Sequence, residues 1–199
     1  LMRADLYLPK QPKQKRSLEK FKKVLNTAEK LLLNKGIHSI TLKEIARKAN
    51  LKRPTLYKFF PHSLSILFAL SEKHIQKIVE LFKANISENK DQKLEWYLNL
   101  LTDVITIYLN RNKAAAILIL SINQIPGSIE INNENNKLLT KKLLQLISEE
   151  ENVYPREKVL IAVEISLAIL SLGYRTEGYI GARFIAEAKR ASLAYIALP

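Results

Sequence analysis

The sequence predicts an all-α protein in which a three-helix N-terminal domain with a helix-turn-helix precedes a larger helical domain. Only seven prolines and five glycines occur among 199 residues. No alternating apolar and polar run between turn signals indicates a strand. Apolar residues recur instead at helical spacing, most clearly in two short helices within residues 41–60. A chain of this length can form one or two helical domains with a substantial core.

The first 16 residues carry Pro9, Pro12 and a group of basic residues with little apolar periodicity. A polar stretch without periodicity is typical of irregular chain, so we expect a flexible basic arm over residues 1–16. Such an arm either contacts a polyanion or is a disordered tail that only adds solubility. The sequence leaves both interpretations open.

Residues 17–35 form the first predicted helix, which ends at Gly36. Its apolar residues recur at helical spacing and therefore share one face. They are Phe21, Val24, Leu25, Ala28, Leu31 and Leu32. A glycine just past the last periodic residue is a common helix stop, because glycine adopts positive φ without strain. We expect this helix to pack across the helix-turn-helix as its third wall.

A capping box opens the helix-turn-helix. Thr41 precedes an apolar-periodic run and Glu44 follows three residues later, which is the Thr-x-x-Glu pattern of a helix N-terminus. The apolar stripe of this helix consists of Leu42, Ile45, Ala46 and Ala49. Asn50 is expected to end it, because asparagine tolerates the left-handed conformation that a short turn needs. Leu51 is placed to fill the space between the two helices.

Pro54 fixes the start of the second helix to within two or three residues. A proline in a helix interior removes a hydrogen bond, but in the first turn its missing N–H has no intrahelical partner anyway. Leu56 and either Phe59 or Phe60 then face the core. The residues left for solvent or a ligand are Arg53, Thr55, Tyr57 and Lys58. A helix-turn-helix whose second helix presents its N-terminal residues to DNA base edges has this layout.

The run from Gly36 to Phe60 resembles the N-terminal signature of the TetR family of bacterial transcriptional regulators. The residues that carry the resemblance are G-I-x-x-I-T-L-x-E-I-A-x-x-A-N-L-x-x-P-T-L-Y-x-x-F. The family usually has glycine where Asn50 stands. It also has an Asn-Lys-Glu-like start to the next helix, where this chain has His-Ser-Leu at residues 62–64. The lysine that would contact a phosphate there is missing.

The resemblance implies a ligand-responsive regulator, usually a repressor, that binds a palindromic operator as a dimer and is released by a small molecule. It divides the chain into the arm (1–16), a helix-turn-helix DNA-binding domain (17–62) and a helical effector-binding and dimerisation domain (63–199). The alternative is a TetR-like scaffold that binds DNA non-specifically, or binds a protein partner, without inducer control.

The basic residues are concentrated in the first third of the chain. Residues 1–62 contain sixteen Lys or Arg and four Asp or Glu, a net charge of +12. The remaining residues contain sixteen and fifteen, a net charge of +1. A local excess of positive charge beside a helix-turn-helix is the electrostatic footprint of a polyanion partner. Double-stranded DNA is therefore the expected partner.

The residues expected to contact DNA fall into two groups, those that suit base edges and those that suit phosphates. Arg53 can bond guanine through two donors, and Tyr57, Lys58 and the apolar edge of Pro54 can complete the base reading. The better candidates for phosphate contacts are Lys48, Lys52, Thr41 and the arm, and the arm would follow the backbone or lie in the minor groove. The complete expected set is Thr41, Lys48, Lys52, Arg53, Pro54, Thr55, Tyr57 and Lys58. For Tyr57 the alternative is a ring packed against the hairpin with only its hydroxyl free.

Four further helices are expected before residue 149, over residues 63–85, 94–110, 114–125 and 138–148. A polar break over residues 87–93 and a Pro-Gly stop at residues 126–127 separate them. An Asn-rich stretch through residue 136 is expected to be a loop. The first of these helices joins the basic third to the near-neutral remainder, and the third is apolar almost all round and therefore central.

The last part of the chain predicts a dimer interface. Pro155 is placed for the first turn of a helix, and residues 159–172 are almost continuously apolar. Gly173 and Gly178 are expected to bracket a turn before a final helix. That helix is rich in small residues, which are Gly181, Ala182, Ala186, Ala188, Ala191 and Ala194. Two such helices from each subunit would make a four-helix bundle of a homodimer, the alternative being an internal hairpin of a monomer.

The near-neutral part is expected to hold the pocket for the small-molecule effector that the resemblance implies. Aromatic walls with a few polar groups suit small apolar ligands. The candidates are Trp96, Tyr97, Tyr108, Gln124, Tyr174 and Phe184. The alternative for each is an ordinary core position, and the sequence does not name the ligand.

Other classes of function find no support in the sequence. Without cysteine the chain has no disulfide, thiolate nucleophile or cysteine-based metal site. The three histidines have no metal-ligand spacing, and no catalytic motif, P-loop or dinucleotide loop occurs. We therefore expect no enzyme, cofactor or metal. The apolar runs fall short of the ~20 residues of a membrane span and the N-terminus lacks a signal-peptide core, so we expect a cytoplasmic protein without a membrane partner.

Overall fold

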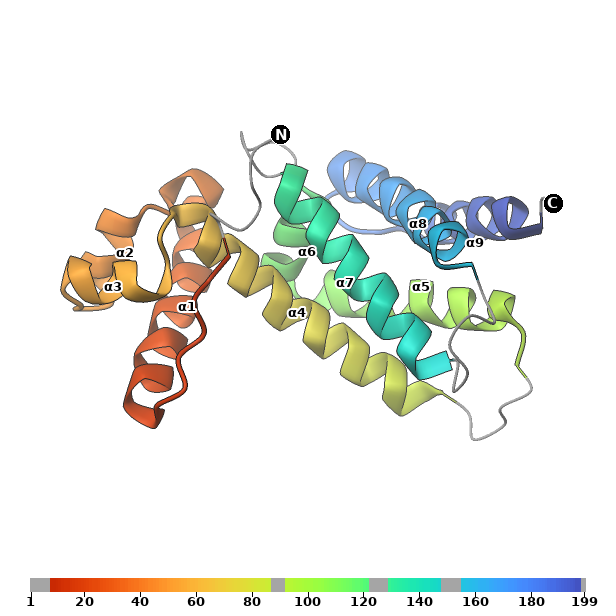
Figure 1. Cartoon of the computed structure of the whole chain (residues 1–199). Helices are drawn as coiled ribbons and strands as arrows, with labels where there is room; N and C mark the ends of the chain where they lie inside the picture. Colours follow the sequence, from red (N-terminus) through yellow and green to blue (C-terminus); the bar gives the residue numbers. More distant parts are fainter. Residues whose placement is uncertain (1–7, 87–91, 122–128, 148–154, 198–199) are drawn as a thin grey trace.

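In the computed structural model, which describes residues 8–86, 92–121, 129–147 and 155–197, all regular elements are helices. They are α1 (Lys15–Lys35), the 3-10 helix η2 (Ile37–Ser39), α2 (Leu42–Lys48), α3 (Arg53–Phe59), α4 (Ser63–Asn85), α5 (Leu94–Arg111), α6 (Lys113–Leu120), α7 (Ile129–Ile147), α8 (Arg156–Glu177) and α9 (Ala182–Ala197). Helices α1 to α3 form one end of the molecule, and the long α4 leads from them into a larger helical body (Figure 1). The predicted fold class is confirmed.

Helix α1 begins at Lys15, two residues earlier than predicted. The carbonyl of Gln14 accepts hydrogen bonds from the N–H groups of Ser17 and Leu18, both at 2.9 Å. Lys15 and Arg16, which we expected in the arm, therefore belong to the first turn of a helix. The six residues of its predicted apolar face are all buried. The helix ends at Gly36, whose φ is +75°, as expected.

The N-terminal core is built around three phenylalanines. Phe21 of α1 stacks on Phe60 with ring centroids 4.6 Å apart and meets Phe59 edge-on at 6.0 Å. All three rings are buried. Because α1 and the end of α3 share these rings, the third wall that the sequence predicted is tied to the helix-turn-helix by aromatic contacts.

Helices α4 and α6 contribute to both cores. The first half of α4 places Leu64, Leu67 and Leu70 in the N-terminal cluster, and its second half packs in the C-terminal cluster. On α6, Ala114 and Leu118 lie in the N-terminal cluster although the helix packs against α5 and α8 as well. Helices α4 and α6 therefore connect the two hydrophobic cores. The boundary expected between residues 62 and 63 stays a prediction.

Helices α8 and α9 form a hairpin that α5 holds in place (Figure 1). Gly178, with φ +76°, ends α8 in the left-handed conformation. Beyond it, the Asn110 side chain accepts from the N–H of Ile180 at 2.8 Å and donates to the Ile180 carbonyl at 3.0 Å. Asp103 pairs with Lys189 of α9 at 2.6 Å. These contacts fix the turn and the direction of α9.

The prediction of an Asn-rich loop through residue 136 is wrong, because the first half of α7 occupies residues 129–136. Among the side chains of α7 that the structure describes, the buried ones are Asn135, Asn136, Leu139, Thr140 and Leu143. Their spacing is helical, and the helix packs against α4 and α8. Asparagine disfavours a helix by only about 0.7 kcal/mol, whereas burying one leucine contributes roughly 1.5–3 kcal/mol. Packing therefore overrides the local preference. Residues 122–128 and 148 lie outside the described part.

Gly173 does not open a turn, contrary to expectation. Helix α8 continues through it and ends at Gly178, and Gly181 precedes the final helix. A Cβ atom at position 173 would lie 2.6–2.9 Å from atoms of Phe184, closer than real contacts. Glycine is needed here because α9 packs a ring against the backbone of α8.

Helix α8 is long and apolar enough to cross a membrane by length and composition, which the sequence analysis did not anticipate. It packs against α5, α6, α7 and α9, and 39% of its apolar window is buried in the fold. Core helices of soluble proteins pass the same test, so this helix is weak evidence for a membrane span.

Candidate nucleic-acid interface

The turn between α2 and α3 is fixed by its backbone. Asn50 has a φ of +50°, the conformation that asparagine tolerates better than most residues. The N–H of Leu51 donates to the carbonyl of Ala46 at 3.0 Å and closes the end of α2. Pro54 lies in the first turn of α3. The expected turn and the expected helix start are both confirmed.

Thr41 caps α2, but Glu44 has a different partner from the one expected. The Thr41 hydroxyl accepts from the N–H of Glu44 at 3.2 Å. The Glu44 carboxylate accepts from the Arg47 guanidinium at 2.7 and 3.0 Å, and this hydrogen bond holds the pKa of Glu44 below its ordinary value. The capping box is therefore half formed, and the acidic group of α2 is paired with Arg47.

The inner face of α3 is anchored in the N-terminal core. Leu56 and Phe60 are fully buried, and Phe59 is nearly so. The sequence predicted one of the two phenylalanines in the core, and the structure places both there. Close packing on this face fixes the orientation of the helix, so its outer face has a defined geometry.

The outer face of α3 carries the side chains that the sequence assigned to base reading. Arg53, Pro54, Tyr57 and Lys58 are exposed, and Thr55 is half-buried. The exposed fraction of Tyr57 is 51%, so a large part of its ring is accessible as well as its hydroxyl. Four exposed residues on a helix of seven residues form a compact surface of donors and one apolar edge.

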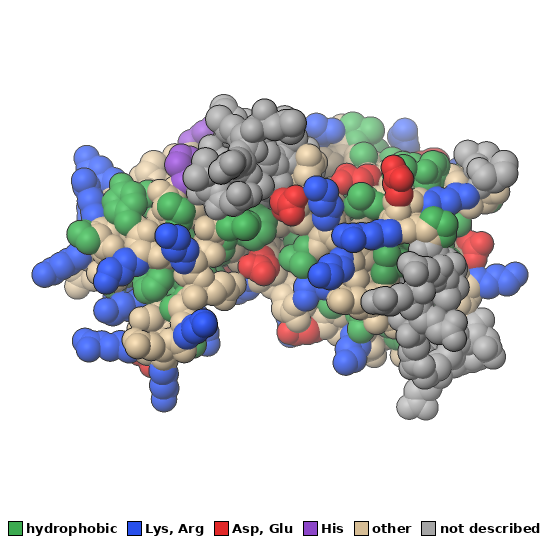
Figure 2. Space-filling model, viewed as in Figure 1, with side chains coloured by type: hydrophobic (Ala, Val, Ile, Leu, Met, Phe, Trp, Pro, Cys, Tyr) green, Lys and Arg blue, Asp and Glu red, His purple; other side chains and the backbone are tan. Residues whose placement is uncertain are grey.

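Thr41, Lys48 and Lys52 are also exposed, around the ends of α2 and before α3. Figure 2 shows Lys and Arg side chains projecting from the end of the molecule that α1 to α3 form, with few acidic side chains among them. The structure thus brings the eight candidate residues onto the two helices of one hairpin. A basic, rigid surface of this kind matches the charge of a phosphate backbone.

The described part of the arm lies against the protein. The N–H of Lys10 donates to the carbonyl of Phe59 at 2.8 Å, and the Gln11 side chain approaches Glu72 of α4 at 3.5 Å. The Phe59 carbonyl is in the last turn of α3, so the arm covers that end of the helix. Residues 1–7 of the expected arm lie outside the described part.

The side chains expected to form an effector pocket are core residues or lie near the core. Trp96 and Tyr97 meet edge-to-face with ring centroids 5.2 Å apart, and Tyr97 is buried in the C-terminal core. Phe184 packs on Gly173, and Tyr174 is half-buried against the core. Gln124 lies outside the described residues. The effector role of this set stays a prediction.

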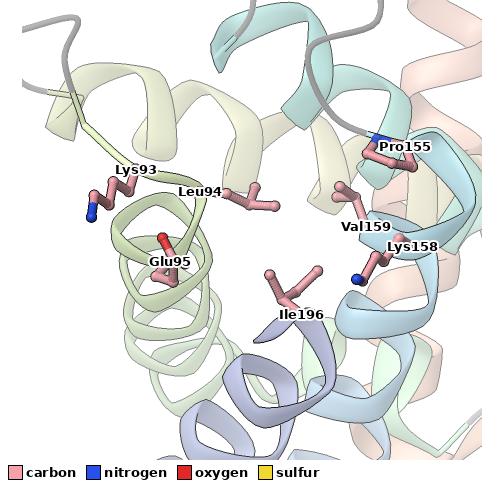
Figure 3. Close-up of a pocket in the computed structure, with 7 residues that line it drawn as sticks. All are labelled: Lys93, Leu94, Glu95, Pro155, Lys158, Val159 and Ile196. Carbon is pink, nitrogen blue, oxygen red and sulfur yellow. The ribbon is translucent and has the colours of Figure 1, made fainter. Parts of the chain in front are cut away.

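A cavity of about 350 Å³ lies elsewhere, at the end of the helical body far from α3. Its lining residues are Lys93, Leu94, Glu95, Pro155, Lys158, Val159 and Ile196 (Figure 3). They come from the starts of α5 and α8 and the last turn of α9. None of the residues predicted for a pocket is among them. Segments so far apart in the chain give no local signal that could have located it.

A polar cluster at the junction of the two cores also escaped the sequence analysis. The buried His74 of α4 contacts the Tyr108 hydroxyl through Nδ1 at 2.7 Å, and its Nε2 lies 3.5 Å from Glu29 of α1. Lys73 pairs with the same carboxylate at 2.7 Å. Burial lowers the pKa of His74 and raises the pKa of Tyr108. The cluster connects the N-terminal α1 to α4 and α5.

Within the described residues, no group of three or more His, Cys, Asp or Glu side chains could hold a metal ion. The histidines lie apart: His38 is in η2, His62 precedes α4, and His74 is buried within it. The His62 ring accepts from the N–H of Leu64 at 3.1 Å and so caps α4.

The same region resembles known proteins in sequence. Residues 24–69 match the model of a family described as bacterial regulatory proteins, tetR family. Over 57 residues the chain is 33% identical to an uncharacterized HTH-type transcriptional regulator of Mycobacterium tuberculosis. That alignment covers 29% of this chain and 30% of the relative, so the chain matches less than a third of the relative's length.

Solved structures extend the likeness to the whole fold. A TetR-family transcriptional regulator from Streptomyces coelicolor superimposes with a TM-score of 0.65 at 21% identity, over 91% of this chain and 97% of that one. Thermus thermophilus FadR, a TetR-family transcriptional repressor in complex with lauroyl-CoA, gives 0.64 at 15% identity, over 90% and 96%. At these identities the likeness is one of fold.

The structure has a helix-turn-helix with an exposed basic second helix, joined to a larger helical body. This arrangement is typical of the class of bacterial helix-turn-helix regulatory proteins. The family match falls on this hairpin and its flanking helices. Residues 24–69 thus match the tetR family in sequence, as the resemblance in residues 36–60 predicted, and the whole chain shares the fold of TetR-family structures.

Proposed function

We propose that the protein is a transcriptional regulator that reads an operator with α3, acts as a homodimer and releases DNA when a small molecule binds. The observation that carries the proposal is the outer face of α3. Arg53, Tyr57 and Lys58 are exposed there on a helix whose opposite face is buried. A rigid helix with exposed donors at its N-terminal half can enter a major groove.

The contacts divide between bases and phosphates. Arg53 bonds a guanine, and Pro54, Tyr57 and Lys58 complete the base reading, while Thr55 at the rim adds a hydroxyl contact. Thr41, Lys48 and Lys52 bind phosphates, which gives affinity without sequence preference. The Thr41 hydroxyl accepts from the backbone of α2, so its own hydrogen can be donated to a phosphate oxygen.

The dimer forms through α8 and α9. Their outward surface includes Leu172, which is 48% exposed, together with small exposed residues. These are Ala168, Ala182, Ala186 and Ala194. Small apolar residues allow two helix pairs to approach closely in a four-helix bundle. In the DNA-bound form the two copies of α3 would lie about 34 Å apart, one turn of duplex.

Effector control acts through the helices that both cores share. Helices α4 and α6 have residues in each hydrophobic cluster, so a shift of the C-terminal body moves the support of α3. The structural neighbour FadR of Thermus thermophilus is a transcriptional repressor with a crystal structure in complex with lauroyl-CoA, which supports a small-molecule effector for this chain. We therefore propose repression in the cytoplasm, relieved by an effector, with no catalytic role for the chain.

Selection from random duplexes at physiological salt tests this function. The full chain should enrich a palindrome whose half-sites are about one duplex turn apart, and light scattering should show a dimer. Screening small molecules for release of the enriched duplex then identifies the effector. Failure to enrich any sequence, with equal binding to all duplexes, would favour the non-specific scaffold.

A further inference from the structure

We propose that the outward face of α1 is a second phosphate-binding surface, which holds the DNA backbone beyond the half-site that α3 reads. The proposal rests on the proposed function in that duplex DNA is the partner, but it uses none of the residues assigned to the hairpin. The surface consists of five exposed cations that share one face of the helix, and we call it the α1 ridge. They are Lys15, Arg16, Lys22, Lys23 and Lys30.

Helical spacing places the five cations on one side of α1. Lys15 and Lys22 are seven residues apart, and Arg16, Lys23 and Lys30 repeat the same interval, which makes nearly two full turns. The two rows lie about 100° apart around the axis, and the six buried residues of the helix occupy the opposite side. At about 1.5 Å per residue, the ridge extends over roughly 22 Å.

The positive charge of the α1 ridge is not neutralised within the described structure. None of its five side chains forms an ion pair with a residue in the ranges that the structure describes. Of the two carboxylates of α1, Glu29 pairs with Lys73 of α4 at 2.7 Å, which leaves only Glu19 near the ridge. By contrast, the exposed Lys137 of α7 pairs with Glu134 at 3.0 Å. The ridge is therefore a field of net positive charge, which a polyanion would neutralise.

Helix α1 adjoins the hairpin at both of its ends. The N–H of Lys10 donates to the carbonyl of the last α3 residue at 2.8 Å, and the exposed Lys10 and Lys13 continue the cations from there to the start of α1. At the other end, the main cause of the lowered pKa of Glu44 in α2 is its hydrogen bond with Arg47, and the nearby charge of Lys35 adds to it. The basic face of α1 thus borders the proposed base-reading surface, and Lys and Arg side chains project from this end of the molecule in Figure 2.

The side chains of the α1 ridge suit a duplex backbone. Double-stranded DNA carries one negative charge per about 1.7 Å of its axis, and lysine binds phosphate as a point charge. The exposed positions between Lys15 and Lys30 include no aromatic residue. Unpaired bases are bound by stacking on aromatic rings, so the ridge does not favour single strands. Because α3 faces the bases of the half-site, the phosphates that the ridge reaches are those beyond it.

Removal of three ridge charges tests the surface. The variant Lys22→Gln/Lys23→Gln/Lys30→Gln changes exposed residues to another good helix former, so thermal unfolding should not change. At physiological salt its affinity for a random-sequence duplex should fall at least about tenfold. The slope of log affinity against log salt concentration should become shallower by about two to three. The charge-conserving variant Lys22→Arg/Lys23→Arg/Lys30→Arg should bind like the native chain.

Removal of the same charge elsewhere is the matched control. The variant Lys83→Gln/Lys93→Gln/Lys141→Gln changes three exposed lysines of the C-terminal body. It lowers the net charge by the same amount as the glutamine variant of the ridge. Its affinity for the random duplex should fall less than about twofold, because charges that do not contact the duplex are screened by salt.

The length of the duplex locates the phosphates. On the selected palindrome, an extension of each end by about ten base pairs, one duplex turn, should strengthen binding of the native chain at least about tenfold. The control variant should gain as much. The glutamine variant of the ridge should gain little, and it should bind the short palindrome like the native chain.

Equal weakening by the ridge and control variants, or native affinity of the glutamine variant of the ridge for the random duplex, would overturn the proposal. Equal losses on the short and the extended palindrome would contradict contacts beyond the half-site. The random-duplex titrations need no operator. A failure to enrich any palindrome would therefore contradict the proposed function while leaving the α1 ridge intact.

Discussion

The two ends of the molecule are built differently, although both are packed from helices. The N-terminal core is mainly aliphatic but holds three phenylalanines in mutual contact, with Phe21 stacked on Phe60 at 4.6 Å, and residues 1–62 carry a net charge of +12. The C-terminal body has a mainly aliphatic core, and residues 63–199 carry +1. Ion pairs such as Lys189–Asp103 tie its helices together. The difference in charge supports the proposed binding of a polyanion by the N-terminal end.

Few elements of the described structure connect the two ends of the molecule. Helices α4 and α6 enter both cores, and Glu29 of α1 reaches the Lys73 and His74 side chains of α4. A change in one region is therefore expected to affect the other through these contacts. The following variants separate stability from binding within each region.

Leu56 and Tyr57 are neighbours on α3 that face opposite ways. Leu56→Ala should lower the free energy of unfolding by about 2–5 kcal/mol, because it leaves a cavity in the N-terminal core. Tyr57→Ala should change it by less than about 0.5 kcal/mol and weaken binding to the selected duplex. Denaturant unfolding and DNA titration measure the two effects. Equal destabilisation by both variants would mean that Tyr57 is a packing residue.

Gly173 tests the packing of the C-terminal hairpin. Gly173→Ala should cost about 1–3 kcal/mol, because the new Cβ atom would overlap the ring of Phe184. Gly178→Ala meets no neighbouring atom but must adopt φ +76°, which costs about 1–2 kcal/mol. Gly178→Asn should be nearly neutral, since asparagine tolerates that conformation. Thermal unfolding distinguishes the variants, and a harmless Gly173→Ala would show that α9 does not pack as described.

Thr41 links local stability to DNA binding. Thr41→Ala removes the hydroxyl that accepts from Glu44 N–H and should cost about 1 kcal/mol. Thr41→Ser keeps the cap and should retain both stability and DNA affinity. If the alanine variant unfolds at the same denaturant concentration as the native protein, the cap contributes nothing to the folded hairpin.

His74 is expected to make stability depend on pH. Burial lowers its folded-state pKa below the ordinary 6.5, so the folded state binds its proton less readily than the unfolded state. The contribution of His74 to the free energy of unfolding is therefore complete above pH 6.5. It is lost as the pH falls below that value, and the free energy of unfolding changes by at most about 1.4 kcal/mol per pH unit. The charged and titratable neighbours are Glu29, Lys73 and Tyr108.

His74→Gln should flatten the fall in unfolding free energy between pH 7.5 and pH 5.5, because the other two histidines are common to both proteins. Denaturant unfolding at several pH values gives the comparison. Parallel curves for the native and variant proteins would show that protonation of His74 does not affect folding.

Features fixed by local backbone chemistry could be predicted from the sequence. The cap at Thr41, the left-handed Asn50, the helix start at Pro54 and the stop at Gly36 each depend on residues within one turn. The exposure of Arg53 and its neighbours followed from the same spacing. Local signals therefore predicted the exposure of these side chains but not the Glu44–Arg47 pair, and their role in DNA binding stays a prediction.

Features that depend on distant contacts could not be predicted. Helix α7 forms over asparagines because its face is buried against α4 and α8, and Gly173 is required by Phe184 eleven positions later. The cavity joins the ends of α5, α8 and α9, and the His74 cluster joins α1, α4 and α5. No spacing within a single segment carries such information.

The most direct test of the account is the ratio of affinities for the selected palindrome and for random duplex DNA, measured for Arg53→Ala and Lys48→Ala. Arg53→Ala should lose about 1–3 kcal/mol on the palindrome and little on random DNA, so the ratio falls. Lys48→Ala should weaken both equally and lower the salt dependence by about one ion. Equal losses on both duplexes for both variants would contradict base reading by α3.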